Sequence, residues 1–371
     1  MLVYCKNCVL PNTRPNNFLN KNGICIACEN HKISNLKINW KKRKKEFSLL
    51  VKNIKKLNRK YDCLIPVSGG KDSTWQVIEC LKMGMNPLCF SYKPPLMTEI
   101  GLINLQNLID LGVHHIHFTI NKKAESKFVL KALKKYGTIG IPMHMAIFNI
   151  SLNLANNFNI PLIIWGENSG MEYGGNDKEA YGKELNTNWI KKYGVSFGKN
   201  AYDWIDNQLT KKDLAPFLPP DKKSFEKKNI RSIFLGYYLR YDPIKSYKVA
   251  KKNGFKELKS GPKTGFYNYA DIDDNMISIH HWFKWYKFGF IRAQDNLSLE
   301  IRNKRITREN ALKILENTNL VKPPISDIKK FCKFVNISEK EFFKIAEKHR
   351  NKSIWKLKNR KWILENCINK Y

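Results

Sequence analysis

Residues 64–75 read LIPVSGGKDSTW, an apolar run that stops at a serine and two glycines before a helix-forming stretch begins. This pattern predicts a strand over 62–67, a tight turn and then a helix. Gly69 and Gly70 permit unusual backbone dihedrals and let the chain approach a ligand closely. The N–H groups of Ser68 and both glycines would converge at the positive end of that helix, an arrangement that favours a bound phosphate.

The three residues after the glycines extend this phosphate-binding prediction. Lys71 would add a positive charge, Asp72 would hold Mg²⁺ or cap the helix, and Ser73 would offer a hydroxyl to phosphate or metal. The motif is not a Walker loop, in which a glycine stands further ahead of the Gly-Lys pair. The alternative is an ordinary strand-turn-helix corner with an Asp or Ser cap.

An α/β fold is indicated by the alternation of strand and helix patterns after residue 61. Repeats of this length predict a parallel sheet with crossover helices and with ligands beyond the carboxyl ends of the strands. GENSGMEYGG, residues 166–175, follows a strand directly and would face the same crevice as SGGKDS. Further strands are predicted at 87–92, 113–120 and 160–166, with helices ending near 82 and over 104–112, 122–136 and 143–158.

Four cysteines near the N-terminus have the spacing of a metal site. Cys5, Cys8, Cys25 and Cys28 form C-x2-C-x16-C-x2-C, two knuckles that can close a tetrahedron around Zn²⁺. The segment between them has little apolar core, so metal binding would supply its folding energy. Four thiolates leave no open coordination position, so we expect a structural or recognition role. The alternative is four unrelated buried thiols.

The composition describes a globular chain with a large positive charge. It has 371 residues and a formal net charge of +34, which would attract polyanions, although much of it can be spread over solvated faces. A nucleic-acid partner is therefore not the favoured interpretation, but the charge alone does not exclude one. The other five cysteines are scattered, and no secretory signal or membrane-spanning stretch is evident, so we expect a reduced, cytoplasmic protein without membrane contact.

Five regions follow from these patterns. They are a zinc ribbon at 1–40, a basic connecting helix at 41–60, a nucleotide-binding α/β domain at 61–175, a polar insertion or lid at 176–234, and a mainly helical C-terminal domain at 235–371.

SGGKDS after DCLIPV resembles the PP-loop of the ATP pyrophosphatases, which cleave ATP between its α and β phosphates. The resemblance implies a PP-loop fold with ATP and Mg²⁺ as ligands. The sequence as a whole is similar to the N-acetyl sugar amidotransferase family of PseA-like and WbpG-like proteins. Besides SGGKDS, the motifs that carry this resemblance are the cysteine knuckles, NLIDLGVHHI, GIPMHMAIF, WGENSGMEYGG, LGYYLRYDP and the long segment from DDNMISIHHW to RITREN. These motifs run through nearly the whole chain.

This second resemblance implies conversion of an acetamido group on a nucleotide-activated acidic sugar into an acetamidino group, in pseudaminic acid, legionaminic acid or O-antigen biosynthesis. An amide carbonyl is a poor electrophile. Transfer of AMP to its oxygen creates a leaving group, and the resulting imidate carbon can be attacked by ammonia. Pyrophosphate is released against the glycine turn, where preorganised donors contribute most to the rate.

The site residues that the resemblance implies fall into three groups. The catalytic candidates are Lys71, Asp72, Glu167 and Glu172, the two glutamates serving as metal ligands, ribose contacts or residues that orient ammonia. The nucleotide candidates are Ser68, Gly69, Gly70, Lys71, Asp72, Ser73, Ser91, Tyr92, Gly166 and Asn168. The substrate candidates are Tyr173, Gly174, Gly175, His280, Lys287 and Arg292, with Arg302 as a further cation. For the C-terminal members, core packing with snorkelling basic residues is the alternative.

The ammonia source is predicted to be a separate protein. A glutaminase needs a nucleophilic cysteine with histidine support or a cysteine at the mature N-terminus, yet position 2 is Leu2. The resemblance implies a glutaminase subunit acting with a cyclase-like subunit. The alternative function is a PP-loop tRNA-modifying enzyme. A thiolase would need sulfur-handling cysteines beside the nucleotide, whereas lysidine-type chemistry would not.

Overall fold

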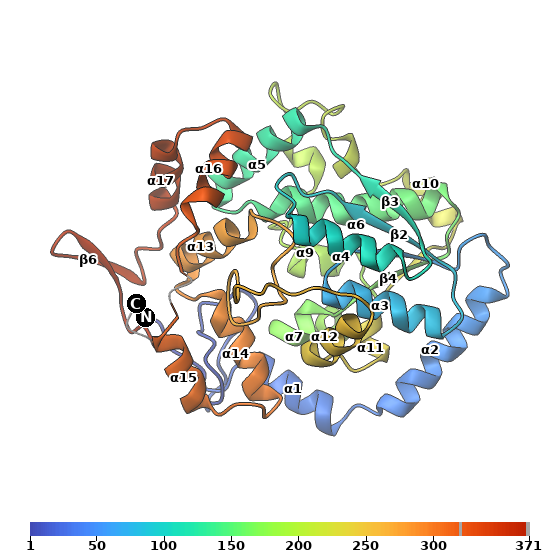
Figure 1. Ribbon diagram of the computed structural model, residues 1–371, viewed down its shortest axis with the longest axis horizontal. Helices are drawn as coiled ribbons and strands as arrows, with labels where there is room; N and C mark the ends of the chain where they lie inside the picture. Colours follow the sequence, from blue (N-terminus) through green and yellow to red (C-terminus); the bar gives the residue numbers. More distant parts are fainter. Residues whose placement is uncertain (319–320, 369–371) are drawn as a thin grey trace.

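The computed structural model describes residues 1–318 and 321–368 and contains one five-stranded parallel sheet (Figure 1). The spatial order of its strands is β3-β2-β1-β4-β5. They are β1 (Cys63–Pro66), β2 (Pro87–Tyr92), β3 (His114–Phe118), β4 (Leu162–Trp165) and β5 (Arg231–Phe234). The predicted α/β architecture with crossover helices is confirmed. Because β1 lies in the centre, the SGGKDS turn leaves the middle of the sheet at its carboxyl edge.

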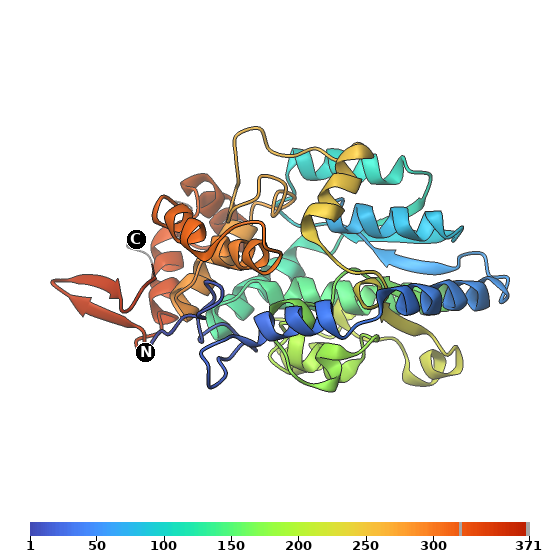
Figure 2. The same ribbon diagram turned by 90° about the horizontal axis from the view of Figure 1, so that it is seen from below.

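Helices cover both faces of the sheet, as Figure 2 shows. Leu64 of β1 packs in one apolar cluster with α5 and α6, and its neighbour Ile65 packs in a second with α2, α3 and α4. Burial of both faces explains why the strands read as apolar runs without alternation. The helices are α2 (Trp40–Lys55), α3 (Lys71–Lys82), α4 (Glu99–Ile109), α5 (Lys122–Tyr136) and α6 (Gly140–Asn157).

The fifth strand corrects the predicted insertion. Residues 231–234 pair in parallel with β4 and complete the sheet, although the sequence prediction placed them in a lid. This strand has only four residues and is polar at its start, so it carries no clear strand signal. Part of the segment before it covers a helix of the sheet domain, since Trp204 and Phe217 both pack on Phe128 of α5. The segment contains α8 (Lys178–Tyr181), α9 (Thr187–Tyr193), α10 (Lys222–Lys227) and two short 3-10 helices, Ala201–Trp204 and Ala215–Phe217.

The C-terminal region is mainly helical, as predicted, but it ends in a hairpin. β6 (Trp355–Lys358) and β7 (Lys361–Leu364) pair antiparallel and project from one end of the molecule (Figure 1). Asn359 and Arg360 both have positive φ, the two-residue turn that hairpins favour. The sequence prediction of a helical C-terminal end is therefore wrong here. The hairpin carries no clear sequence signal because its Asn-Arg turn lacks the usual glycine. The last predicted residues, 369–371, lie outside the described part of the chain. The helices are α11 (Leu235–Tyr238), α12 (Pro243–Lys252), α13 (Ile277–Phe288), α14 (Arg292–Arg302), α15 (Arg308–Glu316), α16 (Ile325–Val335) and α17 (Glu339–Lys348).

The N-terminal segment, residues 1–39 with helix α1 (Ile26–Leu36), is called the cysteine ribbon below. Its own buried apolar cluster consists of the four cysteines with Leu10 and Ala27. Figures 1 and 2 place the N-terminus at the same end of the molecule as the hairpin of β6 and β7. Among the described residues, no helix has the length and apolar character that crossing a membrane requires.

Candidate active site

The glycine turn between β1 and α3 is tightly packed. Gly69 has φ +80°, and a Cβ there would lie 2.5 Å from the backbone nitrogen of Leu105, so α4 packs directly against it. Gly70 is the N-cap of α3 and has no side chain to cap the helix. Ser73 Oγ donates to the Gly70 carbonyl at 3.0 Å, and Ser68 Oγ accepts from Gly70 N at 3.2 Å. Ser68 N also donates to Ser73 Oγ at 3.4 Å, so two of the three N–H groups predicted to face an anion, those of Ser68 and Gly70, have partners within the turn. No side chain caps the first N–H groups of α3, which leaves those groups available to an anion.

Two carboxylates gather beside this turn. Asp72 forms an ion pair with Lys71 and accepts a hydrogen bond of 3.1 Å from the Tyr241 hydroxyl. Burial raises the pKa of Glu167, and the negative charge of Asp72 raises it further. Oxygen ligands of this kind are those that Mg²⁺ prefers, so Asp72 and Glu167 can hold the ion.

Glu167 is placed by close backbone packing. It follows β4, and the backbone nitrogen of Gly236 donates to the Gly166 carbonyl at 2.9 Å. A Cβ at position 236 would lie 3.3 Å from the Cα of Glu167. The glycine of LGYYLRYDP therefore lets α11 approach the loop after β4. The same segment supplies Tyr241, whose role the sequence analysis missed because no local pattern marks a tyrosine as a partner of Asp72.

Glu172 lies on the five-residue helix α7 (Ser169–Tyr173). Burial raises the pKa of its carboxyl to about 7, and the charge of Arg302 partly opposes that shift. The side chain of Glu172 lines a small cavity together with His31 and Tyr241. Glu167 also contributes to the raised pKa of Glu172, so the two predicted acids share one electrostatic environment.

Several predicted nucleotide contacts are occupied within the protein. Asn168 is buried, donates to the Ala180 carbonyl at 2.9 Å and accepts from Trp189 Nε1 at 3.0 Å, so its amide holds α7 in place. The Ser91 hydroxyl lies 2.9 Å from His115 Nε2. The Tyr92 hydroxyl donates to Glu125 in the core. These contacts give the three side chains an internal role, and a contact with nucleotide stays a prediction.

The glycines that end the loop are packed against protein atoms. Gly174 has φ +124°, and a Cβ there would lie 2.6 Å from the carbonyl oxygen of Asn16. Gly175 has φ +157°, and a Cβ there would lie 2.7 Å from the Tyr193 hydroxyl. Both positions require glycine because of these neighbours, whatever ligand approaches the loop.

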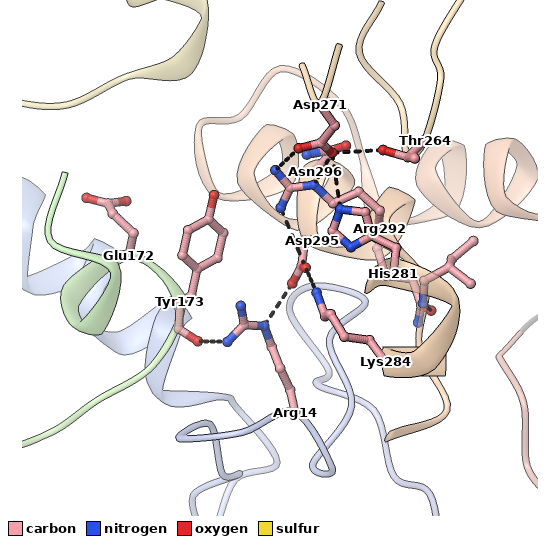
Figure 3. A network of polar contacts seen from close by, with 12 residues as sticks. Arg14, Glu172, Tyr173, Thr264, Asp271, His281, Lys284, Arg292, Asp295 and Asn296 are labelled. Carbon is pink, nitrogen blue, oxygen red and sulfur yellow. Dashed lines mark hydrogen bonds and ion pairs between the residues drawn. The ribbon is translucent and has the colours of Figure 1, made fainter. Parts of the chain in front are cut away.

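A buried carboxylate organises the basic side chains nearby (Figure 3). Asp295 is 1% exposed and faces three cations: Arg14 Nε at 2.8 Å, Lys284 Nζ at 3.0 Å and Arg292 Nη1 at 3.7 Å. Arg292 also pairs with Asp271 at 2.8 Å. The predicted substrate residue Arg292 is thus held between two carboxylates. No local sequence pattern marks Arg14, Asp271, Lys284 or Asp295 as a site residue, because the network joins segments far apart in the chain.

A cavity of about 410 Å³ opens beside this network. Its basic side chains are Arg14, Lys191, Lys192, His280, Lys284 and Lys287, and its aromatic ones are Tyr173, Tyr193, Phe197, Phe288 and Phe290. Among the described residues that line it, none is acidic. Lys287 Nζ donates to the Tyr136 carbonyl at 2.7 Å, and burial lowers its pKa to about 8. The predicted residues Tyr173, Gly174, His280 and Lys287 therefore meet in a space suited to an anion with apolar surface.

The four N-terminal cysteines can hold a zinc ion. Their sulfur atoms all lie within 4.8 Å of one another, with Cys8 and Cys25 at 3.6 Å and Cys5 and Cys28 at 4.0 Å. A zinc–sulfur bond of about 2.3 Å gives tetrahedral edges of about 3.8 Å, which agrees with these separations. The backbone nitrogen of Cys25 lies 3.2 Å from Cys5 Sγ, an N–H contact that suits a thiolate.

Residues 244–368 match the family model described as "LPS biosynthesis protein WbpG-like, C-terminal domain". Residues 244–368, about a third of the chain, are therefore a WbpG-like C-terminal domain. The match begins with α12 and includes Asp271, His280, Lys287, Arg292 and Asp295. The WbpG-like domain therefore supplies three of the six basic side chains that line the cavity, His280, Lys284 and Lys287, whereas the glycine turn comes from the sheet domain.

The other comparisons add little to this assignment. A search of curated proteins gave no match. Two solved structures show distant likeness to this chain. NMN synthetase from Francisella tularensis is 10% identical with a TM-score of 0.33, and the match covers 72% of this chain and 94% of that one. A predicted subunit of tRNA methyltransferase from Methanocaldococcus jannaschii is 16% identical with a TM-score of 0.28, and the match covers 51% of this chain and 75% of that one. Likeness at these scores does not establish a shared fold.

Proposed function

We propose that this protein is an ATP-dependent amidotransferase that forms AMP and pyrophosphate and converts an acetamido group of a nucleotide-activated acidic sugar into an acetamidino group. The observation that carries the proposal is the uncapped start of α3 at Gly70, with Asp72 and Glu167 beside it. The match to a lipopolysaccharide-related family model and the basic cavity support a sugar substrate that carries negative charge.

The chain's own groups suit the adenylation step. The N–H groups at the start of α3 and Lys71 would hold the phosphates, and Asp72 with Glu167 would hold Mg²⁺. The amide oxygen attacks the α phosphorus, and the bond to the β phosphate breaks to release pyrophosphate. Ammonia then adds to the imidate carbon. AMP leaves with the former amide oxygen, and one proton is released.

The cavity is assigned to the sugar substrate. Lys284 and Lys287 would neutralise its carboxylate or phosphates, while Tyr173 and Phe290 offer apolar contact to the acyl group and the sugar ring. This placement agrees with a role in surface-glycan biosynthesis, in the pseudaminic acid, legionaminic acid or O-antigen pathways.

Ammonia is proposed to come from a separate glutaminase subunit that acts with a cyclase-like subunit. Cys63 and Cys89 are fully buried in the core, and burial raises the pKa of both thiols, so neither suits a glutaminase nucleophile. The cysteines of the ribbon are committed to their own cluster.

The test measures AMP and pyrophosphate formed from ATP with ammonium and CMP- or UDP-linked acetamido sugars, and separately with tRNA. Sugar-dependent formation of both products supports the proposal. The D72A variant serves as the inactive control. Formation of ADP, or stimulation by tRNA alone, would overturn it.

A further inference from the structure

We propose that the cysteine ribbon clamps the active-site loop: zinc binding by its four cysteines fixes Glu172 through ribbon side chains that hold α7. Asn30 and Arg14 are then positioning residues. The effect of the clamp on catalysis rests on the proposed function, whereas the contacts between the ribbon and the loop do not depend on it.

Helix α7 cannot be stable by its own hydrogen bonds. It has five residues, and isolated helices this short do not persist in water. The last carbonyl groups of any helix also lack partners within it. The carbonyls of Met171, Glu172 and Tyr173 accept hydrogen bonds, in that order, from Asn30 Nδ2 at 3.1 Å, Arg302 Nη2 at 3.0 Å and Arg14 Nη1 at 2.9 Å. The end of α7 is therefore held by side chains from distant segments, and two of the three belong to the ribbon.

Asn30 joins the two ends of the glycine-rich turn after α7. Its Nδ2 also donates to the Gly175 carbonyl at 2.9 Å, and its Oδ1 accepts from the Tyr181 hydroxyl at 2.9 Å. The side chain is buried and makes three hydrogen bonds through one amide. Because buried amides are costly to leave unpaired, this arrangement specifies one position of the loop relative to the ribbon.

Arg14 and the backbone near it hold the turn from the other side. The Arg14 guanidinium lies 4.9 Å from the centre of the Tyr173 ring as well as donating to its carbonyl. The ribbon also approaches Gly174 so closely that a Cβ would meet the Asn16 carbonyl. Residues 14–30 therefore contribute hydrogen bonds, a cation–π contact and steric fit to the position of the loop, in addition to the contacts made by Arg302 and Asn168.

The ribbon depends on its metal to keep this position. Besides the four cysteines, its apolar cluster contains buried Leu10 and Ala27, with partly buried Leu19, Ile24 and Ile301 packed against them, and we expect a cluster this small to need the metal in order to fold. Asn30 stands two residues after Cys28 on α1, so release of Cys28 from the metal would loosen the start of the helix that carries Asn30. Zinc binding and loop order are therefore expected to be coupled.

The test compares two Asn→Asp substitutions on the same helix. N30D keeps the shape of the buried side chain but removes both Nδ2 donors. N35D makes the same change at an exposed position, where the oxygen that accepts from Arg240 is retained. Hydrogen exchange of residues 169–175 is measured by mass spectrometry without ATP or sugar, together with zinc content.

We expect N30D to retain one zinc per chain and to exchange these amides at least about tenfold faster, while N35D behaves as the original chain. Removing zinc with a chelator should give the original chain the same fast exchange. Unchanged protection in N30D, or full protection after zinc removal, would overturn the clamp. Sugar-dependent AMP formation should fall in N30D. Faster exchange with undiminished turnover would show that the clamp does not contribute to catalysis. An original chain without any such turnover would instead refute the proposed function and leave the exchange result standing.

Discussion

Arg14 Nε of the cysteine ribbon donates to Asp295 Oδ1 of the WbpG-like domain at 2.8 Å, across 281 positions of sequence. Asp295 is almost fully buried and receives two further cations, Lys284 and Arg292. Burial alone would raise the pKa of Asp295, but these three cations hold it well below its usual range. One carboxylate thus connects the metal-binding end of the chain to the basic cavity.

Replacing Asp295 should destabilise the fold more than replacing Arg14. D295N leaves three cations without their shared partner, and we expect a loss of about 3 to 5 kcal/mol in the free energy of unfolding. R14A leaves Lys284 and Arg292 beside the carboxylate, and we expect it to lower the free energy of unfolding by about 1.5 to 3 kcal/mol. Urea denaturation measures both. K131A breaks an exposed pair with Asp206 and serves as the control, with at most about 1 kcal/mol expected. Equal losses in D295N and K131A would contradict this account.

Substitution of Gly69 should affect folding, whereas substitution of Gly70 should affect ATP binding. G69A places a Cβ against the α4 backbone at positive φ, so it should lower the free energy of unfolding by at least about 2 kcal/mol. G70A meets only Ser68 Oγ, at 3.1 Å, and φ there is −68°. It should fold normally but weaken ATP binding. Thermal unfolding and ATP titration separate the two effects, and normal ATP affinity in G70A would argue against phosphate binding at this turn.

Asp72 and Tyr241 should affect turnover without affecting folding. D72A and S68A are expected to abolish pyrophosphate formation. Y241F removes the 3.1 Å hydrogen bond to Asp72, worth about 1.5 kcal/mol, so its rate should fall about tenfold. Circular dichroism checks that each variant is folded. Full activity in D72A would place the reaction elsewhere.

Glu172 should make the folded chain less stable as the pH rises. Burial raises its pKa from 4.5 to about 7, so between these values the folded state keeps a proton that the unfolded state has lost. The free energy of unfolding therefore falls as the pH rises through that window. E172Q removes this ionisation, and its gain in Tm over the original chain should be larger at about pH 8 than at about pH 5. Linkage sets an upper limit of about 3 kcal/mol on this change in the free energy of unfolding. We expect a smaller change because the Glu172 side chain is only partly buried.

The exposed Glu226 provides the matched control for this measurement. E226Q changes the same group at the surface and should shift Tm little at either pH. A gain in Tm for E172Q that is equal at both pH values would show that the carboxylate is not the cause.

Substitution of Cys5 should remove the metal. C5S lacks one of four thiolates, so we expect zinc content to fall well below one per chain and solubility to decrease. Cys332, which lies in a separate apolar cluster, gives the control C332S with zinc retained. A zinc-loaded C5S protein would contradict the four-thiolate site.

The sequence by itself determined the elements whose signals are local. The apolar run before Ser68 and the glycines after it predicted β1, the turn and α3, because strand and helix periodicity and glycine dihedrals act within a few residues. The spacing of the four cysteines likewise predicted their cluster, since metal ligands need only the right separation along a short segment.

The tertiary structure alone decided which side chains meet. Arg14 with Tyr173, Asn30 with Gly175 and Tyr241 with Asp72 are all more than 140 positions apart, and no periodic pattern encodes a hydrogen bond over such a separation. The same reason hid β5, whose pairing with β4 depends on the folded path of the segment between them. Asn168 shows the converse: a polar residue in a predicted ligand loop is used instead to hold the loop, because its buried amide finds its partners within the protein.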